Sequence, residues 1–284
     1  MRRLIARPSH IAAGLLMVAV AAVLGACMSM APLPELSASV SEEGVDPATS
    51  TLVIYRLEDA RTWISNPDRA AERFSPASTS KIPHTLIAIE TGAVTGPDEV
   101  FKWDGQKRFM DNWNEDQTFA DAFKRSTVWI FQTVTPRIGP AVLHDWLQQF
   151  NYGNADVGPA ENVTQYWLTG PLAISAEEQV AFLSHLARRT LPLSARTYDL
   201  AVPVMVADSG PGWTLYGKTG WHSVDGEPEI GWYVGWLEQT GGEAPGTYAF
   251  AFNMDMADPD TALPKRKAVV LRALSDLGAL PASN

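Results

Sequence analysis

The chain has 284 residues, of which 46% are hydrophobic and 19% charged, with a formal net charge of −10. This hydrophobic content is that of a globular protein and excludes a disordered chain. The length suffices for one domain with a full core and an inserted lobe. The excess of acidic residues leaves no basic surface, so nucleic acid is not expected as a partner.

The N-terminal segment predicts export from the cytoplasm. Residues 1–26 contain three early arginines, then an apolar stretch and small residues, which is typical of a cleaved signal peptide. The end of this segment, together with Cys27, resembles the bacterial lipoprotein signal, in which the cysteine is lipidated. The alternative is that Cys27 merely follows an ordinary cleavage site. Because Cys27 is the only cysteine, no disulfide framework is expected. We expect a periplasmic protein, held at the outer membrane if Cys27 carries a lipid.

Residues 27–50 are rich in Ser, Pro, Ala and acidic side chains, and this composition predicts a flexible tether. The folded domain is therefore expected to span residues 51–284. Its first segments, 51–59 and 61–65, are rich in strand-forming residues and predict a pair of strands joined by a polar turn.

The rest of the domain alternates between helical and strand-like patterns. Residues 174–189 predict a helix that begins with a capping box, because a serine and a glutamate lie three residues apart at its start. Residues 229–238 are apolar on both faces of a predicted strand, and residues 247–256 alternate large and small side chains. Residues 265–280 predict a final helix. Both chain ends are therefore expected to form one sheet of an α/β fold around a helical block.

The segment "FSPASTSKIPHTLIAIETG", residues 74–92, places serine and threonine next to a lysine where an apolar helix begins. Ser78 and Lys81 are three residues apart and share a helix face, whereas Ser80 points away from Ser78. A serine attacks acyl groups when a base removes its proton, and a lysine can be that base if burial lowers its pKa. Taken alone, this pattern is more often a helix cap. Pro83, inside the helical run, predicts a local distortion.

A second motif lies in a strand-like context, where Lys218, Thr219 and Gly220 follow one another. The lysine and the hydroxyl can bind a carboxylate, and the glycine lets a ligand approach the backbone. Penicillin-binding proteins and β-lactamases combine S-x-x-K with K-T-G and carry S-D-N between them. No S-D-N occurs here; residues 126–128 read S-T-V and residues 152–154 read Y-G-N.

The order S-x-x-K, S-x-V, Y-G-N, K-T-G resembles the class D (oxacillinase-type) serine β-lactamases. The likeness extends to "PASTSKIP", "LIAIETG", "GPLAISAEEQ" and "GKTGW" and spans about residue 50 to the C-terminus. It implies an antiparallel sheet flanked by helices, with an inserted helical lobe, as in transpeptidases. It also implies hydrolysis of penicillins and related antibiotics through an acyl-enzyme, which confers resistance.

The resemblance also implies residue roles. Ser78 would be the nucleophile, and Lys81 would be the general base as an N-carboxylated lysine formed with carbon dioxide or bicarbonate, with no other cofactor. Ser126, supported by Lys218, would pass a proton to the lactam nitrogen. The backbone N–H groups of Ser78 and Trp221 would form the oxyanion hole.

Further residues follow from the same resemblance. Trp167 would hold the carbamate by its indole N–H, and with Val128 it would form an apolar wall that keeps Lys81 uncharged. Arg266 would bind the substrate carboxylate, unless it is a solvated residue of the final helix. Apart from the resemblance, Met110 in "FMDNW" is a candidate for the edge of the site, the alternative being a place in the core, where methionines more often lie.

Three alternatives stay open at this stage. Glu161 could act as the base instead of Lys81. The protein could be a β-lactam-binding sensor, for which an asparagine would be expected in place of Val128, or a peptidoglycan D,D-peptidase. The histidines lack metal-ligand spacing, so no metal is expected. No pattern in the chain predicts an oligomeric state.

Overall fold

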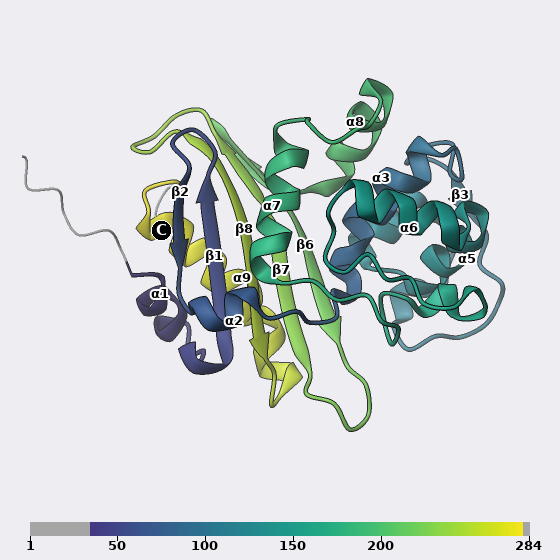
Figure 1. The fold of residues 1–284 in the computed structure, drawn as a ribbon, viewed down its shortest axis with the longest axis horizontal. Helices are drawn as coiled ribbons and strands as arrows, with labels where there is room; N and C mark the ends of the chain where they lie inside the picture. Colours follow the sequence, from purple (N-terminus) through teal and green to yellow (C-terminus); the bar gives the residue numbers. More distant parts are fainter. Residues whose placement is uncertain (1–34, 281–284) are drawn as a thin grey trace, which may run out of the picture. The chain divides into compact units, whose positions relative to one another are not determined.

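The computed structural model describes residues 35–280, so the expected signal peptide and Cys27 lie outside the described residues. A six-stranded antiparallel sheet in the order β2-β1-β8-β7-β6-β5 forms the centre of this part of the chain (Figure 1). Its strands are β1 (Ser50–Arg56), β2 (Arg61–Ile64), β5 (Val206–Gly210), β6 (Trp213–His222), β7 (Ile230–Gln239) and β8 (Gly246–Asp255). The expected sheet built from both chain ends is confirmed.

Helices cover both faces of the sheet. In Figure 1, α7 (Ala176–Ala187) lies in front of the strands and α9 (Pro259–Asp276) lies behind them. The ten residues of β7 are nearly all buried, as the apolar pattern of that strand predicted. On β8 the large side chains pack into the cluster that contains α9, and the alanines pack into the cluster on the other face.

The helical block forms a lobe beside the β6 side of the sheet (Figure 1). Its helices are α3 (Lys81–Glu90), α4 (Phe119–Arg125), α5 (Val128–Ile138), α6 (Pro140–Gln149) and α8 (Ala195–Ala201), with the short strands β3 (Val100–Phe101) and β4 (Gln117–Thr118). Short 3₁₀ turns are η1 (Pro47–Thr49), η2 (Ala77–Ser80), η3 (Asp111–Trp113), η4 (Ala160–Gln165) and η5 (Val202–Met205), and α2 (Pro67–Ala71) precedes η2.

The predicted capping box of α7 is present, because the Ser175 hydroxyl accepts from the Glu178 N–H and the Glu178 carboxylate accepts from the Ser175 N–H.

The structure describes no helix long and apolar enough to cross a membrane.

The expectation of a flexible tether over residues 27–50 is wrong for its second half. Residues Leu36–Glu42 form α1, which buries Leu36 and Val40 in the same apolar cluster as α9. Ser39 donates a hydrogen bond to Asp276 at 2.7 Å. Two apolar residues four apart give this short helix a buried face, and the polar composition around them concealed that signal.

Candidate active site

The first motif forms a tight turn that brings its serine and lysine together. Ser78 lies in η2, and Lys81 begins α3, so the two side chains meet and the Lys81 Nζ donates to the Ser78 Oγ at 3.0 Å. Ser80 instead donates to the Ala77 carbonyl and is buried. The Ser78 side chain caps neither η2 nor α3, which removes the helix-cap interpretation.

Backbone distortion is present at this turn, but Pro83 is not its cause. Pro83 is the third residue of α3, and the first turn of a helix needs no amide donor there. The unusual residue is Ala77, whose φ of 45° lies in the left-handed region immediately before Ser78. A non-glycine residue in that region is held there by its surroundings, which fixes the direction of the Ser78 side chain.

Lys81 is enclosed by aromatic rings. Its Nζ lies 5.0 Å from the centre of the Phe131 ring and 6.0 Å from that of Trp167, and the side chain is fully buried. Burial alone lowers the pKa of Lys81 from 10.5 to about 7. Val128, three residues before Phe131 on α5, is half-buried. The apolar wall therefore includes Phe131, which sequence reasoning missed although it shares a helix face with Val128.

His84 completes this buried pocket. Its ring lies 5.5 Å from that of Trp167 and 5.2 Å from that of Phe131, so it shares both aromatic neighbours with Lys81. Burial, followed by the Lys81 charge, lowers the pKa of His84 to about 3, so the imidazole is neutral at pH 7. Sequence reasoning missed His84, although its position three residues after Lys81 on the same helix is a signal that could have indicated it.

Several buried polar atoms around Lys81 have no hydrogen-bond partner within residues 35–280. They are the Trp167 Nε1, the His84 Nδ1, the Tyr166 hydroxyl and the Thr85 hydroxyl. Buried donors without acceptors are rare in folded proteins, so each of these atoms can bond a water molecule or another small group.

The Y-G-N motif positions the loop that carries Trp167. Asn154 donates to the Pro171 carbonyl at 2.7 Å and accepts from the Ala173 N–H at 3.0 Å. A Cβ on Gly153 would lie 2.1 Å from the Ala173 carbonyl, so only glycine fits there. The motif therefore acts through the backbone of the loop that follows it.

A second serine–lysine pair lies opposite the first. Ser126 is the C-cap residue that follows α4, with a φ of 60°, and its hydroxyl accepts a hydrogen bond from Lys218 on β6. Lys218 also donates to the Thr219 carbonyl at 3.0 Å. Burial, and then the charges of Lys81, Arg266 and Lys267, lower the pKa of Lys218 well below its ordinary value.

The strand that carries the K-T-G motif, β6, has a free edge next to the turn that carries Ser78. Beyond Tyr216, β6 pairs only with β7, and the open edge faces η2. A Cβ on Gly220 would lie 2.9 Å from the Pro76 carbonyl and 3.0 Å from the Thr79 methyl group. The glycine is thus required by close contact with η2, not by ligand approach alone. Trp221 follows with 36% of its surface exposed.

Arg266 is not a solvated residue of the final helix. It is half-buried on α9, its NH1 donates to the Gly220 carbonyl at 2.6 Å, and its Nε donates to the Leu263 carbonyl. Burial lowers its pKa to about 10, so it stays charged at pH 7. The structure therefore places a cation beside the K-T-G strand.

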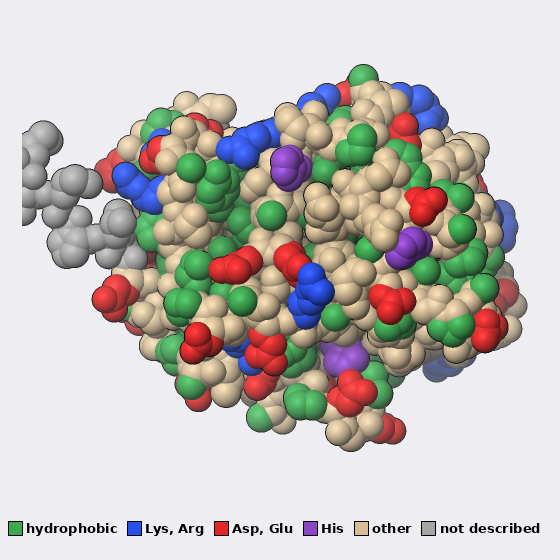
Figure 2. Space-filling view, in the orientation of Figure 1, with side chains coloured by type: hydrophobic (Ala, Val, Ile, Leu, Met, Phe, Trp, Pro, Cys, Tyr) green, Lys and Arg blue, Asp and Glu red, His purple; other side chains and the backbone are tan. Residues whose placement is uncertain are grey.

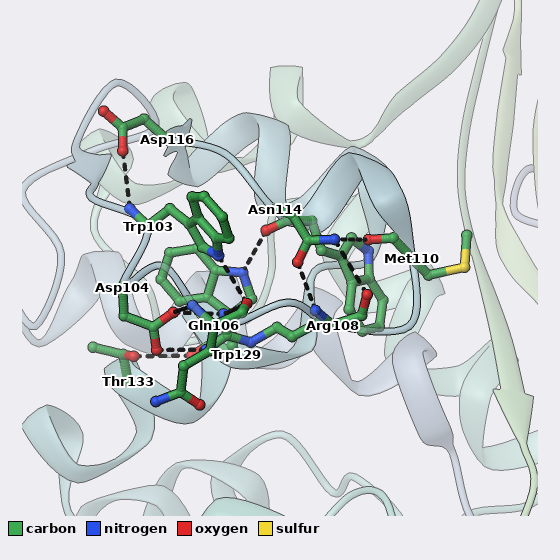
Figure 3. Close-up of polar contacts among 10 residues, drawn as sticks. Trp103, Asp104, Gln106, Arg108, Met110, Asn114, Asp116, Trp129 and Thr133 are labelled. Atoms are coloured by element: carbon green, nitrogen blue, oxygen red, sulfur yellow. Dashed lines mark hydrogen bonds and ion pairs between the residues drawn. The ribbon is translucent and has the colours of Figure 1, made fainter.

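Met110 stands on a loop held together by polar contacts. Arg108 forms an ion pair with Asp104, and Asn114 accepts from the Arg108 N–H and donates to the Met110 carbonyl. The Met110 side chain projects away from this network (Figure 3) and is 39% exposed. Trp129 on α5 donates to the Trp113 carbonyl and anchors the loop to the lobe that carries Ser126.

The last candidates are the alternative base, Glu161, and a metal site. Glu161, the alternative base, is exposed at the start of η4. Residues 35–280 contain no group of three or more His, Cys, Asp or Glu side chains that could hold a metal ion. On the face seen in Figure 2, Lys and Arg side chains are scattered among acidic ones and form no continuous basic patch.

Residues 45–275 match the family model of the penicillin-binding protein transpeptidase domain. The chain is 39% identical to β-lactamase OXA-2 from Salmonella typhimurium, in a match that covers 82% of each chain. It is 36% identical to β-lactamase OXA-48 from Klebsiella pneumoniae, in a match that covers 81% of this chain and 84% of that relative. A class D β-lactamase structure from Nostoc, YbXI, superposes with a TM-score of 0.81 at 37% identity, covering 86% of this chain and 99% of that chain. The chain belongs to the class D serine β-lactamases.

This membership agrees with the fold and confirms the family that the motifs indicated. The class D β-lactamase FUS-1 (OXA-85) from Fusobacterium nucleatum gives a TM-score of 0.79 at 33% identity, covering 86% of this chain and 98% of that chain. The antiparallel sheet flanked by helices, with its inserted lobe, is thus the class D fold.

Proposed function

We propose that this class D β-lactamase hydrolyses the amide bond of penicillins and related antibiotics through an acyl-enzyme on Ser78, and so confers resistance. The observation that carries this proposal is the 3.0 Å contact between the half-buried Ser78 hydroxyl and a fully buried Lys81. A nucleophile within hydrogen-bond reach of its base is the arrangement that acyl transfer requires.

Lys81 is the proposed base, and its surroundings fit an N-carboxylated lysine. A carbamate forms only on a neutral amine, and the pKa of about 7 leaves a large neutral fraction at neutral pH. The unpartnered Trp167 Nε1–H is a donor for a carboxylate group at that place. The added carboxylate would supply a base that takes the Ser78 proton and later one from water. Phe131 and Trp167 exclude bulk water from it.

Ser126 and Lys218 are the proposed proton carriers to the leaving nitrogen. The Ser126 hydroxyl accepts from Lys218, so its own proton is free to point toward the substrate. Backbone N–H groups of Ser78 and Trp221 lie on adjoining segments, η2 and the free edge of β6, and together they can bind the oxygen of the tetrahedral intermediate.

Thr219 and Arg266 are the proposed contacts for the substrate carboxylate. Gly220 brings β6 against η2, which sets the distance between the nucleophile and this strand. Met110 is the proposed apolar contact at the rim, with Trp221.

Turnover of a chromogenic cephalosporin separates the three functions. A β-lactamase gives sustained turnover, a sensor gives one burst with a stable adduct, and a D,D-peptidase cleaves peptide substrates instead. Ser78→Ala should lower hydrolysis by at least ~10⁴-fold and abolish labelling by a fluorescent penicillin. Ser80→Ala is the matched control and should keep its label; persistent labelling of Ser78→Ala would refute the assignment.

We also propose that the enzyme is exported to the periplasm and anchored to the outer membrane by a lipid on Cys27. This proposal is supported by the residues before the only cysteine, which resemble a lipoprotein signal. Metabolic labelling with a radioactive fatty acid should mark the wild-type protein and not Cys27→Ser. Equal labelling of both proteins would exclude the anchor.

A further inference from the structure

A cavity of about 320 Å³ lies beside Lys218, at the edge where β6 leaves β5. Its wall comes from six elements: α4, η5, the start of β5, β6, β7 and α9. None of the roles proposed above uses this space, although Lys218 and Thr219 form one of its sides.

The cavity wall is positively charged. Lys124 from α4, Lys218 from β6 and Lys267 from α9 line it, and no acidic residue does. Lys267 lies 5.7 Å from the centre of the Tyr233 ring, and neither it nor Lys124 forms an ion pair in the described part of the chain. Asp208 is near enough to influence Tyr233 but does not line the cavity. In a chain with a net charge of −10, two exposed lysines, Lys124 and Lys267, and the buried Lys218 thus lie around one cavity that no acidic residue lines.

The charge on Lys218 couples the cavity to the active site. Positive neighbours, Lys267 among them, help to lower the pKa of Lys218, which bonds to Ser126. An anion in the cavity would oppose that effect and favour the charged form of Lys218. Occupancy of the cavity is therefore expected to act on the group that supports the leaving nitrogen.

The position of the cavity indicates which part of a substrate reaches it. Thr219, the proposed contact of the substrate carboxylate, lines the cavity together with Lys218, so the substituent next to the carboxylate is the part of a β-lactam closest to it. This step rests on the proposed function. We propose that the cavity is a subsite for an anionic substituent, a second carboxylate or another oxyanion, on the carboxylate side of the β-lactam.

Cephalosporins that share one acyl side chain and differ in a 3-substituent that is retained on hydrolysis provide the test. The wild type should hydrolyse the anionic member with a lower KM than the neutral and cationic members. Lys267→Gln and Lys124→Gln should each raise KM for the anionic member by about threefold to tenfold and leave KM for the neutral member unchanged. An effect of Lys267 through Lys218 should instead change kcat equally for all three members. Lys267→Glu should reverse the preference, so that the cationic member has the lowest KM.

Lys265→Gln is the matched control, because Lys265 lies on the same helix but donates to the Gly44 carbonyl. Inorganic phosphate should inhibit the wild type competitively and inhibit Lys267→Glu less. Equal KM changes for all three substrates, or none for the anionic one, would overturn the subsite. Failure of the wild type to hydrolyse the neutral member would instead contradict the proposed function.

Discussion

Ser78 and Lys81 lie three residues apart on one turn, whereas Ser126 and Lys218 lie 92 residues apart and meet across the junction of lobe and sheet. The first lysine has its pKa lowered by burial alone, and the second by burial together with three positive neighbours. The first lysine can thus be uncharged in an apolar enclosure, and the second responds to the charge of what binds beside it. The Ser78–Lys81 pair therefore suits nucleophilic attack with a neutral base, and the Ser126–Lys218 pair suits proton transfer to the leaving nitrogen.

Replacing the lysine of the first pair should have the largest effect. Lys81→Ala removes the amine that lies within hydrogen-bond reach of Ser78, so we expect kcat/KM to fall by about 10⁴-fold. Stopped-flow measurement should show that both acylation and deacylation are slow. Glu161→Gln is the control and should keep its activity; an inactive Glu161→Gln with an active Lys81→Ala would reverse the two roles.

Replacing either residue of the Ser126–Lys218 pair should lower activity less than Lys81→Ala does. Ser126→Ala and Lys218→Ala should each lower kcat by about 10²- to 10³-fold, because proton transfer to the leaving nitrogen loses its carrier or its support. The double variant should be little worse than either single one, since the two groups act as a unit. Additive losses in kcat would show that Ser126 and Lys218 act separately.

The first pair should also set the response to acid. Below pH 7 the neutral fraction of Lys81 falls about tenfold per pH unit, so activity in bicarbonate-free buffer should fall in the same proportion. Activity falls with falling pH because the Lys81 amine must lose its proton before it can react with carbon dioxide. Added bicarbonate should restore activity at pH 6; a flat profile from pH 6 to pH 8, with no response to bicarbonate, would rule out this dependence.

Removing one donor near Lys81 should have a smaller effect. Trp167→Phe keeps an aromatic ring but loses the Nε1–H that has no partner among the described residues, so about tenfold more bicarbonate should be needed for half-maximal activity. Tyr166→Phe removes a neighbouring unpartnered hydroxyl and serves as the control. An equal response in both variants would assign the effect to general loosening of the pocket.

Arg266→Ala is expected to give the smallest change, a rise in KM of about threefold to tenfold with a minor fall in kcat. The guanidinium holds the Gly220 carbonyl and places a positive charge next to Thr219, so its loss weakens substrate binding more than chemistry. Steady-state kinetics with Arg266→Lys should recover part of the affinity. An unchanged KM in Arg266→Ala would remove this residue from the site.

The contrast between the pairs also explains what the sequence could predict. Helical spacing alone brought Ser78 to Lys81, and alternation along β8 assigned its two faces correctly. The contact of Ser126 with Lys218 depends on how the lobe meets the sheet, so it came only from the resemblance to a family. No local pattern could have predicted the lysine-lined cavity, because its wall comes from six elements of the fold.

α1 was missed for a similar reason. Its buried face consists of only two apolar residues, Leu36 and Val40, and it becomes stable by packing into the same apolar cluster as α9 at the other end of the chain. A short helix with such a weak pattern cannot be distinguished from a linker until its tertiary partner is known.

The difference between the two lysines is tested most directly by ¹³C NMR of the enzyme in ¹³C-labelled bicarbonate. The account predicts one carbamate resonance in the wild type that is lost on acidification and absent from Lys81→Ala. Lys218→Ala should keep this resonance, because its Ser78–Lys81 pair is intact. A spectrum without a carbamate resonance at pH 8, or a resonance that disappears in Lys218→Ala and persists in Lys81→Ala, would contradict the account.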